Sequence, residues 1–197
     1  GFWDIMAGGG LVHPVPVLKE APCTEWIKPV DLTSVLTPGI STPITLPPWE
    51  FVRDDSAYFF ENENRLGERY YFWSSGEGFD DPAPLPIPDG HPGQGMLVMH
   101  TDNCANPEAC PLQQQNAPFS WHIIAADGLD EGGAGTQCGA DGDPWPGSTN
   151  NTRFNCNTNP ASRWYNENSC TGLEVLDVVP DGMGSVRVTF SWVPTSL

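Results

Sequence analysis

The C-terminal end of the chain carries the pattern of a β-hairpin. An apolar run over Leu173–Val179 leads into a Pro-Asp-Gly turn at 180–182. After the turn, apolar residues alternate strictly with polar ones from Val186 to Trp192. This alternation with a period of two places the apolar side chains on one face of a strand, where they are buried against a core. The segment therefore predicts two antiparallel strands joined by a tight turn.

Short apolar runs interrupted by proline and glycine make up most of the remaining sequence. The chain has 21 Pro and 21 Gly among 197 residues, and in the proline-rich stretch 14–37 only Val17–Ile27 has room for a short helix. Apolar and aromatic runs predict strands at 57–60, 70–73, 95–100 and 120–126, with a turn region over 61–69. The continuous run 95–100 is typical of a strand buried on both faces. We expect a mostly β fold, either a β-sandwich or a jelly roll.

A proline-rich stretch divides the sequence near residue 40. Five prolines and glycines lie between Thr37 and Pro48, which predicts a connection between two parts. We expect an irregular or helical segment over 1–40 and a β-rich domain over 41–197.

Charge and cysteine content indicate an extracellular protein. The chain has 25 acidic and 8 basic residues, a formal charge of −17 that argues against nucleic acid or an anionic membrane as partner. No apolar run approaches the roughly 20 residues that a membrane-spanning helix needs. Six cysteines in a chain rich in Gly, Pro and Asn favour disulfides and an oxidising compartment.

The first ten residues contain a Trp-Asp-x-Met segment that runs into three glycines, with Met6 as the methionine. This segment resembles the methionine turn that lies beneath the zinc ion of secreted zinc peptidases. Further blocks occur in the order found in the immune inhibitor A-type secreted metallopeptidases. They are Tyr70-Tyr71-Phe72-Trp73, Gly78-Phe79-Asp80, Leu85-Pro86, Gly93 to Asp102, Ala125-Ala126-Asp127-Gly128, Gly142-Asp143-Pro144-Trp145-Pro146-Gly147, Asn151 to Phe154 and Pro160 to Tyr165. The chain departs from that family at 74–76, where Ser-Ser-Gly replaces Glu-Asn-Arg.

The resemblance implies that residues 1–40 are a remnant of a zincin-like catalytic domain. In this family the zinc helix with its His-Glu-x-x-His pattern precedes the methionine turn, and no such pattern occurs in the chain. Zinc is expected only on a segment N-terminal to Gly1, and the chain alone is not expected to be an active peptidase. Two functions remain open. One is a non-catalytic extracellular protein derived from a metallopeptidase, which associates with itself as a structural or filament subunit. The other is the C-terminal fragment of an active secreted zinc metallopeptidase, whose partner is the N-terminal peptidase fragment.

The four histidines lack the spacing of a zinc site. His100 and His122 fall on expected strands, where we interpret them as buried structural residues. Trp121, Trp164 and Trp192 are interpreted as core residues. Trp73 and Trp145 could equally pack in the core or face a partner, and the sequence leaves both alternatives open.

Two glycine-rich loops concentrate acidic residues. Carboxylate oxygens that converge in such loops bind Ca²⁺, so calcium is the expected cofactor and solvated surface carboxylates are the alternative. The candidate ligands are Asp102, Asp127, Asp130, Glu131, Asp141 and Asp143.

The cysteine spacing favours local disulfides. Cys104 and Cys110 are expected to pair across a short loop, and one pair is expected among Cys138, Cys156 and Cys170, with Cys23 joining the N-terminal segment to the β domain. Asn150 begins an Asn-Asn-Thr glycosylation sequon in the same region.

Overall fold

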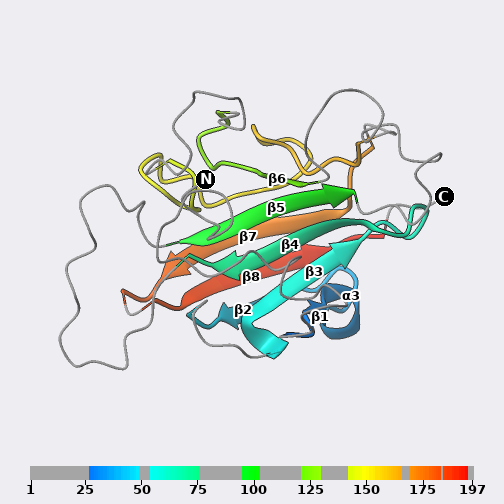
Figure 1. The fold of residues 1–197 in the computed structure, drawn as a ribbon, viewed down its shortest axis with the longest axis horizontal. Helices are drawn as coiled ribbons and strands as arrows, with labels where there is room; N and C mark the ends of the chain where they lie inside the picture. Colours follow the sequence, from blue (N-terminus) through cyan, green and yellow to red (C-terminus); the bar gives the residue numbers. More distant parts are fainter. Residues whose placement is uncertain are drawn as a thin grey trace.

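A computed structural model describes residues 27–48, 54–75, 95–102, 121–129, 142–165, 169–182 and 184–194 of the chain. These ranges are mostly β and form two sheets, with little helix (Figure 1). The prediction of a mostly β chain is therefore confirmed. The short helix expected within 17–27 lies almost entirely outside the described residues.

The larger sheet has five strands in the order β1-β3-β4-β5-β6. The strands are β1 (Val30–Asp31), β3 (Ala57–Glu61), β4 (Glu68–Ser74), β5 (Met96–Asp102) and β6 (Trp121–Ile123). β1 pairs with β3 in parallel, and the other neighbours are antiparallel. Helix α3 (Leu32–Val35) follows β1 and lies beside β1 and β3, and a 3-10 turn, η1 (Asp54–Ser56), leads into β3 (Figure 1).

The smaller sheet has the order β2-β8-β7. Its strands are β2 (Thr42–Leu46), β7 (Leu173–Pro180) and β8 (Val186–Trp192). β7 and β8 form the hairpin that the alternating sequence predicts, with Pro180 opposite Val186 beside the turn. β2 was not expected, because the stretch 37–48 reads as a connection. Its proline, Pro43, is tolerated because β2 pairs with only one neighbour among the described strands, so half of its backbone groups need no strand partner.

The strands predicted in the middle of the chain are present, with shifted ends. β4 begins at Glu68, within the stretch expected to be a turn, because the Asn62 amide donates to the Glu68 carbonyl (2.9 Å) and closes the turn tightly. β6 ends at Ile123, short of the expected 126. The chain turns away there because the Ala126 and Asp127 amides donate to the carbonyls of Asp143 and Gly142.

The two sheets share one apolar core. Strand alternation places Phe60, Tyr70, Phe72, Met96 and Val98 of the larger sheet toward Leu173, Val175, Val178, Val186, Val188 and Phe190 of the smaller one. The rings of Phe72 and Phe190 meet edge to face, with centroids 5.3 Å apart. Leu32 and Leu36 of the α3 region pack in the same core. The division of the chain near residue 40 stays a prediction.

The opposite face of the larger sheet is buried as well. A second cluster contains Ala57, Tyr71, Trp73, Leu97, Met99 and Ile27. Met96 to Thr101 are therefore buried on both faces of β5, as the continuous apolar run predicts. Trp73 and Trp145, left open from the sequence, are both core residues. Trp164 is also in the core, and Trp192 packs against it.

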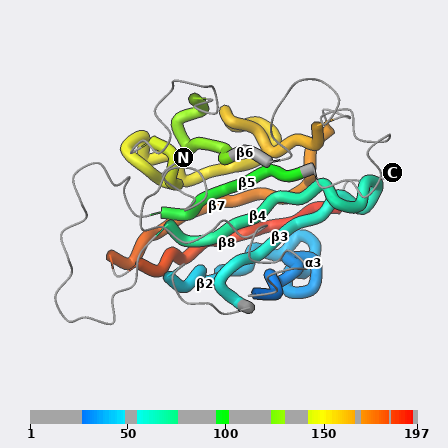
Figure 2. Tube along the Cα trace, viewed as in Figure 1, coloured from blue at the N-terminus to red at the C-terminus, as the bar shows by residue number. Residues whose placement is uncertain are grey.

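Residues 142–165 run along the β5–β6 side of the larger sheet and are yellow to orange in Figure 2. Trp145 and Met96 exchange two backbone hydrogen bonds of 2.8 Å, so this segment extends the pairing of β5 at its start. Gly95 permits this approach, because a Cβ at that position would overlap the Trp145 carbonyl oxygen. The other end of the segment is fixed by a disulfide between Cys156 and Cys170, a pair that the sequence left open among three cysteines.

Candidate functional site

The structure brings part of the predicted calcium site together. The backbones of 126–127 and 142–143 pair, through bonds of 3.1 Å from Ala126 N to Asp143 O and 3.2 Å from Asp127 N to Gly142 O. The Asp127 carboxylate lies against Gly142, where a Cβ would overlap its Oδ2 atom. The two acidic loops therefore adjoin, as the calcium hypothesis requires.

The remaining calcium candidates are less clearly placed. Asp102 ends β5 opposite Glu68, away from the paired loops in the strand register. Asp130, Glu131 and Asp141 lie outside the described residues, as does Met6. Within the described ranges, no group of three or more His, Cys, Asp or Glu side chains is arranged to hold a metal ion. Calcium binding stays a prediction.

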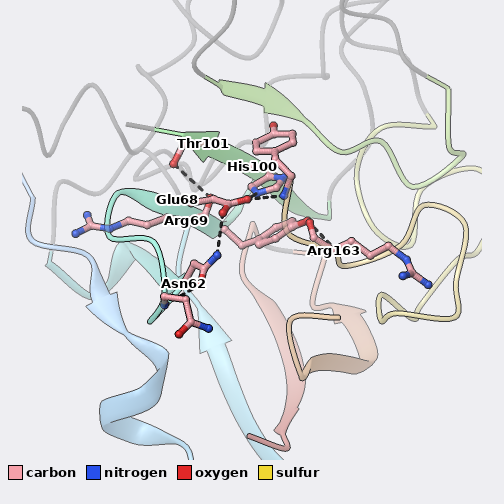
Figure 3. Close-up of polar contacts among 9 residues, drawn as sticks. Asn62, Glu68, Arg69, His100, Thr101 and Arg163 are labelled. Atoms are coloured by element: carbon pink, nitrogen blue, oxygen red, sulfur yellow. Dashed lines mark hydrogen bonds and ion pairs between the residues drawn. The ribbon is translucent and has the colours of Figure 1, made fainter. Parts of the chain in front are cut away.

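A buried polar cluster lies between β4, β5 and the segment 160–165 (Figure 3). Glu68 is its centre and is fully buried, at 0% exposure. Its Oε1 accepts from the Tyr165 amide (2.6 Å) and contacts His100 Nε2 (3.1 Å), while its Oε2 accepts from Asn62 Nδ2 (2.9 Å). Three donors from three parts of the chain thus converge on one carboxylate.

The His100 ring is enclosed by aromatic rings. Tyr165 stacks on one face with centroids 3.6 Å apart, and Tyr70 on the other at 4.1 Å, with interplanar angles of 5° and 14°. His100 is only 2% exposed. The Tyr70 hydroxyl donates to the Arg163 carbonyl (2.7 Å) and accepts from the Arg163 amide (3.2 Å). These contacts join the sheet to the segment on both sides of Trp164.

Burial and hydrogen bonding fix the protonation of this cluster. Burial raises the pKa of Glu68, but the hydrogen bonds from His100, the Tyr165 amide and Asn62 outweigh it, so the pKa lies below its usual value. Burial lowers the pKa of His100, against the opposing influence of Glu68. Burial also raises the pKa of Tyr70 far above its ordinary range. At neutral pH the cluster holds a carboxylate, a neutral imidazole that donates from Nε2, and a phenol.

This arrangement is suited to holding structure together. Both faces of the imidazole are covered by rings, and the carboxylate is surrounded by protein donors, so neither group is presented to a bound substrate. His100 is buried and hydrogen-bonded, as expected from the sequence, and its purely structural role stays a prediction. His122 lies opposite it on β6, and its side chain is outside what the structure describes.

A disulfide closes the segment that carries Tyr165. Cys156 and Cys170, 14 positions apart, have Cα atoms separated by 5.2 Å. The Thr171 amide, just after this loop, donates to the Ser162 carbonyl within it (3.2 Å). Trp164 stacks on Phe60 in the core with ring centroids 5.9 Å apart. The remaining cysteines, 23, 104, 110 and 138, lie outside the described residues, so their pairing stays a prediction.

Asn150 lies in an exposed turn. Its φ is 54°, and the Asn151 amide donates to the Pro146 carbonyl to close the turn. The Asn151 side chain donates to the Ala126 carbonyl (2.9 Å), which fixes the middle of the sequon to the calcium-candidate loops. The sequon is therefore accessible at its first residue and anchored at its second.

Glu68, Tyr70 and Tyr165 were not predicted from the sequence to be members of a cluster. The sequence does contain a signal for Glu68 and Tyr70, because strand alternation places both on the same face as the apolar Phe72. A carboxylate on an apolar face requires a polar partner. His100 is a candidate for that partner, because its side chain projects from the same face of the sheet on the neighbouring strand. The contribution of Tyr165 comes from a loop and has no comparable signal.

Of the sequence blocks on which the expected family resemblance rests, those within the described residues lie next to one another in the fold, and those at 78–80 and 85–86 lie outside the described residues. β4 and β5 are neighbours, and β5 pairs with the 142–147 block through Trp145. The 125–128 block bonds to the 142–147 block and to Asn151. Phe154 packs on Trp145 with centroids 5.3 Å apart, and Tyr165 stacks on His100.

No known protein family, curated protein or solved structure matches the chain. In the part of the chain that the structure describes, no helix has both the length and the apolar character needed to cross a membrane.

Proposed function

We propose that this chain is a non-catalytic, β-rich module derived from a secreted metallopeptidase of the immune inhibitor A type. The observation that carries the proposal is the spatial convergence of the resembling blocks around β5. Six segments separated in sequence, 70–73, 95–102, 125–128, 142–147, 151–154 and 160–165, form one continuous region through the contacts described above.

In this proposal the two facing sheets are a β-sandwich, and residues 1–40 correspond to the end of a zincin-like catalytic domain. The role of the module is to support a catalytic domain and its substrate. The enclosed Glu68–His100 pair favours a supporting role, because its geometry stabilises a loop and leaves no acid or base directed at a substrate. The Cys156–Cys170 disulfide suits an extracellular location, and calcium at the 127–131 and 141–143 loops would hold the irregular side of the module.

Activity of the purified chain tests this proposal. The chain, produced in an oxidising host, is incubated with a fluorogenic protein substrate and zinc, with an active zinc peptidase as positive control. The proposal predicts no cleavage above that of a mock purification. Cleavage that zinc chelation abolishes, and that elutes with the chain on a sizing column, would contradict it.

A second candidate is a self-associating extracellular subunit. One observation favours it: Ile40 and Val193 are 56% and 57% exposed, and a backbone hydrogen bond of 2.8 Å from Gly39 to Trp192 brings their segments together. Two large apolar side chains on neighbouring exposed segments are a feature of association surfaces.

Light scattering at micromolar concentration tests the second candidate. If the chain assembles through this surface, Val193→Glu abolishes the assembly. Leu66→Glu is the matched control, because Leu66 is 74% exposed but lies in the β3–β4 turn. A monomeric wild-type chain removes this candidate and leaves the supporting module.

A further inference from the structure

We propose that Asp181 is a site of slow self-modification, at which the exposed turn between β7 and β8 converts aspartate into isoaspartate. The reaction joins the Asp181 side chain to the backbone nitrogen of Gly182. It needs water as its one co-reactant, and it does not depend on the function proposed above.

Aspartate followed by glycine is the dipeptide in which this reaction meets the least steric resistance. Glycine has no Cβ, so its amide nitrogen can approach the preceding carboxyl carbon without a clash, and its backbone rotates freely. The chain has four such pairs, at 89–90, 127–128, 141–142 and 181–182. The structure describes both members of two pairs, Asp127-Gly128 and Asp181-Gly182, and these two lie in different surroundings.

The Asp181-Gly182 pair lies at the tip of the β7–β8 hairpin. Both residues are exposed, and a Cβ added at Gly182 would meet no atom within 4 Å. Among the residues that the structure describes, none accepts a backbone hydrogen bond from the Gly182 amide. The nitrogen that must react is therefore open to approach.

Two hydrogen bonds join Asp181 to Ser185 across the turn. The Asp181 amide donates to the Ser185 carbonyl (3.0 Å), and the Asp181 Oδ1 atom accepts from the Ser185 amide (3.1 Å). The second bond must break before the carboxyl carbon can turn toward Gly182. Because this bond is exposed, water replaces it at little cost. The turn can thus reach the reactive arrangement without disturbing either sheet.

The Asp127-Gly128 pair is held more firmly. The Gly128 amide donates to the Ala125 carbonyl (3.0 Å), so the nitrogen that would react is already engaged. The Asp127 carboxylate accepts from the Leu129 amide (2.9 Å) and also lies against Gly142. Reaction at this pair would require all of these contacts to be lost together. The same dipeptide is therefore protected here and accessible in the hairpin.

The reaction balances without an oxidant or a reductant. The Asp181 carboxylate takes one proton from solvent, and the Gly182 nitrogen bonds to Cγ. The Cγ hydroxyl then leaves as water with the amide proton, which closes a succinimide ring within the chain. Water opens this ring in a second step. Attack at Cγ restores aspartate, whereas attack at the main-chain carbonyl leaves the backbone running through Cγ, and this product is isoaspartate.

Isoaspartate changes the geometry of the turn. It adds one methylene to the backbone between Asp181 and Gly182 and moves the free carboxylate to the α-carbon. The bond from the Ser185 amide to Oδ1 cannot form in its present geometry, so this amide should lose protection against hydrogen exchange. The amide of Phe190, well inside β8, should keep its protection.

Ageing of the full chain tests the proposal. Folded protein with its disulfides intact is kept warm at neutral pH for several weeks, and its peptides are then compared by chromatography and mass spectrometry. We expect the peptide containing Asp181 to divide into two peaks of equal mass, the new one resistant to an endopeptidase that cleaves before aspartate. The Asp127 peptide should stay a single peak. Equal conversion at both pairs, or no conversion at Asp181, would overturn the proposal.

A denatured reference separates the fold from the dipeptide. In concentrated urea, with the disulfides intact, both pairs should convert at similar rates, because the contacts that protect Asp127 are lost. A preference for Asp181 that is as strong in urea as in the folded chain would show that the fold does not set it, and the proposal would fail.

Two variants test the chemistry at this position. Asp181→Glu keeps the charge, but its longer side chain would have to close a less favourable six-membered ring, so the second peak should disappear. Asp181→Asn should give the same isoaspartate faster, with ammonia in place of water as the leaving group. A second peak that persists in Asp181→Glu would place the modification at another residue and contradict the assignment.

Discussion

Replacing Phe190 by alanine tests the packing of the two sheets. Phe190 is fully buried on β8, and its ring meets Phe72 of the larger sheet at 5.3 Å. Removing a phenyl ring from such a site leaves a cavity and lowers the free energy of unfolding by about 3–5 kcal/mol. For a chain of this length each kcal/mol corresponds to roughly 2–4 °C, so the Tm should fall by about 6–20 °C. Arg187→Ala, at an exposed position on the same strand, is the control and should change the Tm by no more than about 2 °C.

A double-mutant cycle with Phe72→Ala makes this test specific for the contact. Because the rings touch across the two sheets, the losses should be non-additive, with a coupling energy of about 0.5–1.5 kcal/mol beyond area burial. The measurement is urea unfolding of the four proteins with the disulfides intact. Strict additivity, or a small loss for Phe190→Ala alone, would refute the facing arrangement of the sheets.

Three further predictions concern the irregular side of the molecule. Replacing Cys156 and Cys170 by serine should lower the free energy of unfolding by about 3 kcal/mol, given their separation of 14 positions, and an unchanged urea midpoint would contradict this. Calcium should raise the Tm by several degrees at concentrations far above its Kd, and Asp127→Asn should reduce the shift; an unchanged Tm in chelator would identify the carboxylates as ordinary surface charge. In a glycosylating host, Asn150→Gln should remove the mobility shift that a glycan-removing enzyme produces, whereas a wild-type chain without that shift would show the sequon to be unused.

Strand positions were largely predictable, because they depend on local alternation. Leu173–Val179, Val186–Trp192 and the buried run 95–100 all became strands for that reason. β2 was missed because Pro43 reads as a breaker unless its place at the edge of a sheet is known.

The buried cluster was predictable only in part. Glu68 and His100 project from the same face of adjacent strands, which is a local signal. Tyr165 binds Glu68 from 97 positions away along the chain, through a loop closed by a disulfide. Likewise, the pairing of 126–127 with 142–143 follows from tertiary contacts that no periodicity encodes.

Binding to a metallopeptidase catalytic domain tests the central claim most directly. The chain is mixed at micromolar concentration with the zinc-binding domain of an immune inhibitor A-type peptidase from which the corresponding module has been deleted. Molar mass is then measured by light scattering after size exclusion. A supporting module predicts a one-to-one complex that restores stability to the truncated peptidase. Two separate peaks at all concentrations, with no gain in peptidase stability, would contradict the proposed function.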